Sequence, residues 1–227
     1  MDEDQASGDL PQTDWVKHLP DQILFFDVET TGIGPNDRIV AFAAIMLDWS
    51  LADQSRLSTK VMNFVFDPGI RSHPEAEAIH GMDDWFLRHQ EPFSKQAAVI
   101  AEFVSGADLI VSHNIDFDYL FLLRDLSAAG IALPRTKAEC TMRLWANTHR
   151  LRYRPSLNAI ASEIGLPQRE ARHSAMEDAW LCMVVWLYLK TPWRLGAFPG
   201  GEAAVRKNVQ PVPQRPDGRL PPRRRAV

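Results

Sequence analysis

The sequence predicts an α/β domain in which a mixed sheet of about five strands is flanked by helices. Two observations predict this class: strand patterns come first with helical patterns mainly after them, and a helical pattern returns between two strands. With 227 residues, 45% of them apolar, the chain is long enough to bury a substantial core.

Three strand patterns open the domain, each a largely apolar run bounded by turn residues: Ile23–Glu29, Arg38–Trp49 and Ser58–Phe66. The turn Thr30-Thr31-Gly32 ends the first strand. Pro68-Gly69 then begins a loop, which we expect to run to about Met82.

Helical patterns make up most of the remaining domain: Asp83–His89, Ser94–Ser105, Asp116–Ala129, Cys140–Leu151, Ser156–Ile164 and Ser174–Lys190. Gly106 and Gly130 follow the second and third of these, where glycine favours a helix end. A short buried strand, Leu109–Ser112, lies between them.

The two ends of the chain carry opposite charges. Residues 1–21 hold six acids against Lys17, and residues 197–227 hold seven bases against two acids, within a net charge of −4. We expect an acidic flexible segment over 1–21, a single domain over 22–195 and a Pro/Arg-rich flexible tail over 196–227. Because no strong positive charge covers the whole chain, any binding of nucleic acid must be local or mediated by cations.

The cysteines and the apolar runs bear on the compartment. Cys140 and Cys182 lie far apart, so we expect two buried thiols in a reducing environment. The start MDEDQASGD lacks the features of a signal peptide, and the apolar run Ala179–Leu189 is too short to span a bilayer. A cytoplasmic protein without a membrane partner is expected.

Two carboxylates lie inside the first strand. Asp27 and Glu29 are two residues apart, so their side chains leave the same face, where like charges repel. Taken alone, such a pair is usually a strand end that reaches water.

Two further segments carry acids and a histidine. Asp116 and Asp118 follow the strand Leu109–Ser112, and alone they could simply favour a helix N-terminus. His173 and Asp178 open the last helical pattern; since five helical steps would turn them to different faces, we place His173 in the preceding loop. Alone, His173 would be read as a surface loop residue.

Acids from three segments can converge only if divalent cations neutralise them. Oxygen donors favour hard ions such as Mg²⁺ or Mn²⁺. Two such ions about 4 Å apart suit an in-line displacement at a phosphodiester.

Taken together, these segments resemble three motifs of the DnaQ-like exonuclease family, in its DEDDh subgroup. They are FDVETTG, the HN-x-x-FD of His113–Asp118 and the H-x-x-x-x-D of His173–Asp178, and the likeness covers about residues 22–190. Ile79-His80-Gly81 and Ser156–Ile160 also resemble family segments. The resemblance implies a ribonuclease H-like fold and 3′→5′ exonuclease activity; the family includes the proofreading subunit of the bacterial replicative polymerase.

By this resemblance, Asp27, Glu29, Asp118 and Asp178 would bind two ions, Mg²⁺ or Mn²⁺, with Asp27 shared. His173 would be the general base. The family pattern selects Asp118, the acid after Phe117, over Asp116 as the ligand.

The resemblance further implies residues that contact the terminal nucleotide: Thr30, Thr31, Ile33, Phe117 and His80. Phe117 equally fits core packing. The expected substrates are single-stranded or frayed 3′ ends of DNA, and a polymerase subunit is a candidate partner.

Alternatives remain open: an exoribonuclease, and a non-catalytic module that binds nucleic acid or a polymerase. Basic residues at Arg135, Lys137, Arg143 and His149–Arg154 fit a strand-binding surface or an ordinary solvated face.

Overall fold

The computed structural model describes residues 19–48, 58–166 and 173–191. Most of the predicted acidic segment, Trp49 and the predicted C-terminal tail lie outside these ranges.

Five strands form one sheet in the order β3-β2-β1-β4-β5, which confirms the predicted mixed sheet. The strands are β1 Gln22–Thr30, β2 Ile39–Asp48, β3 Ser58–Val65, β4 Leu109–Ser112 and β5 Lys137–Cys140. Strand β2 runs antiparallel to β1 and β3, whereas β4 runs parallel to β1 and β5. The carboxyl ends of β1 and β4 therefore meet at one edge of the sheet.

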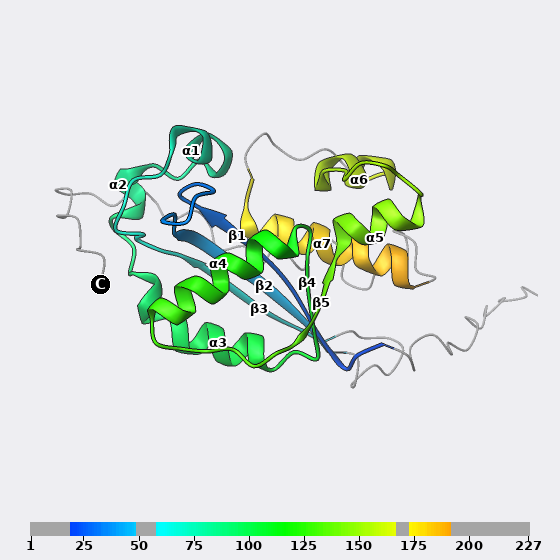
Figure 1. Ribbon diagram of the computed structural model, residues 1–227, viewed down its shortest axis with the longest axis horizontal. Helices are drawn as coiled ribbons and strands as arrows, with labels where there is room; N and C mark the ends of the chain where they lie inside the picture. The colour runs from blue at the N-terminus through cyan, green and yellow to red at the C-terminus, as the bar shows by residue number, and fades with distance from the viewer. Residues whose placement is uncertain (1–18, 49–57, 167–172, 192–227) are drawn as a thin grey trace, which may run out of the picture.

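Helices cover both faces of this sheet. They are α1 Pro74–His80, α2 Asp84–Leu87, the 3₁₀ turn η2 Phe93–Lys95, α3 Ala97–Ser105, α4 Ile115–Ala128, α5 Thr141–Thr148, α6 Leu157–Glu163 and α7 Ala175–Lys190. Figure 1 shows α4 crossing in front of the strands, with α5 and α6 beside α7 at the right.

The alternation of β1 decides which helices lie on which face. Leu24 and Phe26 pack in one buried cluster with α3 and α4. Ile23 and Phe25 point the other way and pack against α7, where the rings of Phe25 and Trp186 meet edge to face at 5.6 Å. Because both faces are covered, β1 is a nearly continuous apolar run, and polar residues within it are exceptions.

A third buried cluster holds α5 and α6 against α7, and it includes Trp145, Ile160 and Val185. Cys140 and Cys182 are buried free thiols, as the sequence predicts. None of the helices in the described ranges combines the length and apolar character that a bilayer crossing needs.

Two predictions of local structure were wrong. The expected loop up to Met82 contains helix α1, which is short and buries His80 alone of its residues. The edge strand β5, Lys137–Cys140, was not predicted, and the expected helix Cys140–Leu151 is present over Thr141–Thr148. The residues of β5 are partly exposed and do not form the apolar run that marks a buried strand in a sequence.

Candidate metal site and nucleotide-binding loop

Strand β1 presents Asp27 and Glu29 on the face that packs against α7. Their partners across the antiparallel ladder are Ala43 and Ala41, whose small side chains leave room for two acids. Asp27 is half-buried and Glu29 is buried. The two carboxylates that the sequence predicts to repel each other therefore lie side by side in a largely buried position.

Helix α7 brings a third carboxylate to this pair. Asp178 lies in the first turn of α7, where the helix dipole favours an anion, and it is buried. One carboxylate oxygen each from Asp27, Glu29 and Asp178 lies within 4.8 Å of the other two. These donors, all oxygen, fit a hard divalent cation.

His173 lies in the loop before α7, as its spacing to Asp178 predicts. Its backbone N–H donates to the carbonyl of Ile79 at 3.0 Å. Its Nδ1 lies 3.2 Å from Oδ2 of Asp178, and its side chain is 38% exposed. The imidazole therefore stands beside the three acids and reaches solvent.

Asp118 has a different environment from the other predicted ligands. It lies on α4, 3% exposed, and its carboxylate accepts hydrogen bonds from the Ser112 hydroxyl and, at 3.4 Å, from the backbone N–H of Val28. Burial raises the pKa of Asp118 to about 7, although both hydrogen bonds act to lower it. Asp118 is not one of the three clustered carboxylates. It accepts a hydrogen bond, however, from Val28, the residue between Asp27 and Glu29.

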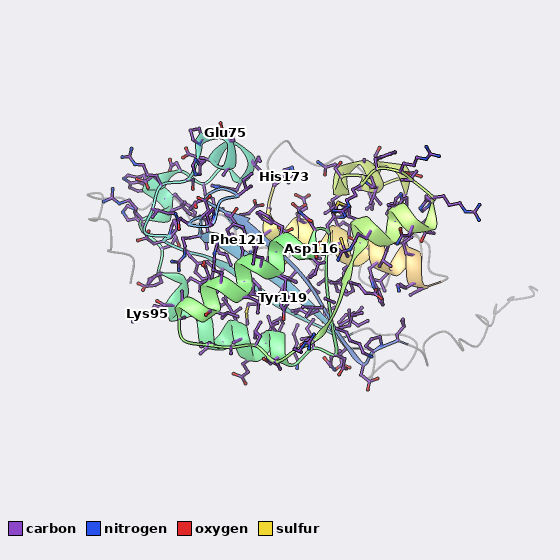
Figure 2. All side chains as sticks on the ribbon, viewed as in Figure 1. Glu75, Lys95, Asp116, Tyr119, Phe121 and His173 are labelled. Carbon is purple, nitrogen blue, oxygen red and sulfur yellow. The ribbon has the colours of Figure 1, made fainter. Side chains whose placement is uncertain are left out.

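The neighbouring acid, Asp116, is placed elsewhere. Its side chain is 67% exposed and pairs with Arg143. Figure 2 shows Asp116 at the start of α4.

The loop after β1 carries three of the predicted substrate-binding residues. Thr30 donates to the Gly32 carbonyl at 2.7 Å, and Thr31 is fully buried. Ile33 is 90% exposed, so it presents an apolar side chain to solvent. A Cβ at Gly32 would lie 2.6 Å from Oδ2 of Asp37, so this close turn requires glycine.

Buried Asp37 holds this loop from within. Its carboxylate accepts from the Thr31 hydroxyl and from the Gly34 N–H, both at 2.7 Å. Arg124 of α4 donates to the carbonyls of Gly34 and Asp37. The backbone on both sides of Ile33 is thus held, by Asp37 within the loop and by Arg124 from α4.

Phe117 and His80, the other predicted contacts, point into the protein. Phe117 is half-buried and packs on Phe121 with ring centroids 4.7 Å apart. His80 is buried, and its Nδ1 accepts from the Met82 N–H at 3.0 Å. Burial lowers the pKa of His80 to about 4, so its ring is neutral near pH 7.

The sequence did not predict roles for Ser112, Asp37 and Arg124. These residues form hydrogen bonds that position Asp118 and the loop after β1. The position of Ser112 at the end of a buried strand was an available signal. No spacing rule links Asp37 to Thr31 or Arg124 to Gly34, because those bonds depend on the tertiary fold.

Comparisons with known proteins show which family and fold this chain shares. The RNase_T family model, described as an exonuclease, matches residues 24–185. The DNA polymerase III subunit epsilon of Escherichia coli is 24% identical over 192 residues, which cover 80% of this chain and 73% of that protein. The 3′-5′ exonuclease DinG of Bacillus subtilis is 24% identical over 180 residues, 78% of this chain but 18% of DinG.

Solved structures match at the level of the fold. The zinc-bound complex of E. coli ExoI with single-stranded DNA aligns with a TM-score of 0.61 at 21% identity, covering 75% of this chain and 41% of that one. Exonuclease I from Methylocaldum szegediense aligns with a TM-score of 0.58 at 20% identity, covering 72% and 39%. The chain thus spans about two fifths of these exonucleases, and the expected ribonuclease H-like fold is confirmed.

The family match extends from β1 through most of α7 and so includes the strand, loop and helix that carry the three clustered carboxylates and His173. This chain belongs to the RNase_T, or DnaQ-like, family of 3′→5′ exonucleases.

Proposed function

We propose that this chain removes mononucleotides from single-stranded or frayed 3′ ends of DNA by metal-dependent hydrolysis of the terminal phosphodiester. The observation that carries this proposal is the approach of Asp27, Glu29 and Asp178 to within 4.8 Å of one another. DNA is the preferred substrate because the relatives include DNA polymerase III epsilon subunits and the structural neighbours include complexes with single-stranded DNA. The nuclease unit would comprise residues 22–195, of which the family model matches 24–185.

The donor set fits two hard cations, Mg²⁺ or Mn²⁺. Asp27, Glu29 and Asp178 offer oxygen ligands, and Asp118 is adjacent through Val28. We assign these four carboxylates as the ligands, with Asp27 shared. When bound, the ions would acidify the attacking water and stabilise charge on the leaving oxygen.

His173 is proposed to remove the proton from the attacking water. The tautomer that donates from Nδ1 to Asp178, 3.2 Å away, keeps the lone pair on Nε2, and that nitrogen can accept the proton. The water oxygen then bonds to phosphorus as the bond to the 3′ oxygen of the preceding nucleotide breaks. That oxygen takes a proton from solvent, and a nucleoside 5′-monophosphate leaves.

The loop after β1 is proposed to hold the terminal nucleotide. Exposed Ile33 would pack on the terminal base, while the backbone near Thr30 and Thr31 contacts the sugar and phosphate. Thr31 already donates its N–H to the Arg38 carbonyl at 2.9 Å, so its contribution is mainly to shape the loop. Phe117 and His80 would support this region from the core.

The test is an assay on one 20-nucleotide sequence made as DNA and as RNA, each labelled at the 5′ or the 3′ end. With Mg²⁺ or Mn²⁺, we expect a ladder of shortened DNA from the 5′ label and immediate release of labelled mononucleotide from the 3′ label. EDTA and the Asp27→Asn variant should abolish both, which excludes a contaminating nuclease. Faster shortening of RNA would make the chain an exoribonuclease, and intact strands that still bind would favour a non-catalytic module.

A further inference from the structure

We infer that the connection between α5 and α6, residues His149–Pro155, binds the phosphate backbone of a single-stranded nucleic acid upstream of its 3′ end. This inference rests on the proposed function. We call this segment the basic loop. Between Cys140 and Ser162 the sequence has no Asp or Glu, whereas Arg150, Arg152 and Arg154 fall within a few residues. Because the whole chain carries a net charge of −4, such a local cluster is where a polyanion would be attracted.

The side chains of the basic loop face solvent. Arg150, Arg152 and Arg154 are exposed, and Tyr153 between them is 66% exposed. No carboxylate in the described part of the chain forms an ion pair with these three arginines, in contrast to Arg143, which pairs with Asp116. Their guanidinium groups are therefore available to bind phosphates in the bidentate manner that arginine favours.

Both ends of the basic loop are anchored in the fold. At the first end, His149 donates its backbone N–H to the Trp145 carbonyl at 3.0 Å, and nearby Leu151 donates its N–H to the Ala146 carbonyl at 2.8 Å and packs on the cluster around Trp145. Pro155 is buried, and its carbonyl accepts from Nε2 of His113 at 3.1 Å. A loop fixed at both ends loses less conformational entropy when it binds a ligand.

The backbone of Arg150 supplies an independent observation. Arg150 has a φ of 54°, which places it in the left-handed region, directly after the cap of α5. Glycine is favoured there, and a residue with a Cβ is disfavoured by about 1 kcal/mol. Since such a residue persists only where the surrounding structure holds it, the path of the basic loop after α5 is determined by the fold.

The basic loop is connected to the candidate site through β4. His113, which binds Pro155, directly follows Ser112, whose hydroxyl donates to Asp118. A single-stranded nucleic acid whose 3′ end lies at Asp27, Glu29 and Asp178 could therefore extend toward the basic loop. The exposed ring of Tyr153 favours nucleic acid over an acidic peptide, because a base can stack on it while the arginines bind flanking phosphates.

The test compares two triple variants that remove equal charge. One is Arg150→Ala/Arg152→Ala/Arg154→Ala, and the control, at exposed bases elsewhere, is Lys60→Ala/Arg71→Ala/Lys95→Ala. Figure 2 places Lys95 at the left of the molecule, whereas the connection between α5 and α6 lies at the right in Figure 1. Binding of a labelled 20-nucleotide DNA is measured by fluorescence anisotropy in EDTA over a range of salt concentrations.

For the basic-loop variant we expect Kd to rise about tenfold or more and the slope of log K against log salt to shrink by about 2, since each single-strand phosphate contact adds about 0.7. Tyr153→Ala should weaken binding about tenfold, whereas Tyr153→Phe should not, because stacking requires the ring alone. The rate constant for cleavage of a dinucleotide should be unchanged in all of these variants.

Equal losses in the two triple variants would overturn the inference, and so would unaltered binding by Tyr153→Ala. Displacement of the DNA by a poly-glutamate peptide at matched charge concentration would instead identify a general acidic partner and also overturn it. Failure of the wild-type chain to cleave DNA would count against the proposed function, while the salt slopes separately decide the role of the basic loop.

Discussion

The loop after β1 and the segment before α7 both reach the candidate site, and they are held in contrasting ways. The loop is locked by the buried carboxylate of Asp37 and by Arg124 reaching from α4. His173 is partly exposed; its backbone is attached to α1 and its ring contacts Asp178. A rigid loop suits the placement of a nucleotide, and a less enclosed imidazole suits a group that must exchange protons with water.

The largest effect on activity is expected for Asp118, which is buried and held by hydrogen bonds from Ser112 and Val28, as the loop after β1 is held by Asp37. Asp118→Asn should lower kcat about 10⁴-fold, since it removes a carboxylate that we assign to the metal ions. Asp116→Asn is the matched control, two residues away and paired with Arg143, and it should keep most of the activity. Rates measured on 5′-labelled DNA with Mg²⁺ check this, and the reverse result would mean that the motif is read in the wrong register.

His173→Gln tests the segment before α7, the less enclosed of the two segments. We expect kcat to fall about 10³-fold with KM nearly unchanged, because a general base acts in the chemical step rather than in binding. His89→Gln serves as a control, since His89 instead contacts Trp85 on α2. If His173→Gln raised KM and left kcat intact, His173 would belong to the binding surface instead.

The faces on which the acidic residues lie were predictable from the sequence, because side-chain direction repeats every two residues in a strand and about every 3.6 residues in a helix. Alternation in β1 places Asp27 and Glu29 on one face, and helical rotation separates His173 from Asp178. The approach of Asp178 to Asp27 came from the family resemblance, because no local rule determines which helix packs on which face.

Other features were not predictable because their signals are weak or tertiary. The signal for β5 is faint, since Lys137-Ala-Glu-Cys is half polar and lies at the sheet edge. Helix α1 lacks an apolar stripe, although Pro74 at its start and Gly81 at its end, with a φ of 71°, are favoured there. The bond between Asp37 and Thr31 spans a loop that reads only as a turn.

Two variants sharpen the role of the rigid loop. Asp37→Ala removes the acceptor of the buried Thr31 hydroxyl and of the half-buried Gly34 N–H, so it should lower the free energy of unfolding by about 1–3 kcal/mol and raise KM about tenfold. Ile33→Ala should raise KM with unaltered stability, because Ile33 is 90% exposed. Denaturant unfolding and steady-state kinetics check both, and an unaltered KM in each variant would remove the loop from substrate binding.

The smallest effect concerns pH and His80, which lies next to the residue that anchors His173. Its pKa is lowered from 6.5 to about 4 by burial, so the unfolded chain takes up this proton more readily. The stability that neutral His80 provides is present above pH 6.5 and declines as the pH falls toward 4. His80→Asn keeps an acceptor for the Met82 N–H, and its stability should fall less steeply over that window when both proteins are unfolded in urea. Parallel curves for the two proteins would contradict this.

The central claim is that Asp27, Glu29 and Asp178 act together as a site for divalent cations. Calorimetric titration of Mn²⁺ into the wild-type chain, Asp27→Asn and the surface control Glu75→Gln tests it without depending on activity. We expect saturable binding by the wild type and the control, and loss of at least one bound ion per chain in Asp27→Asn. Equal binding by all three proteins, or no binding by any, would contradict the claim.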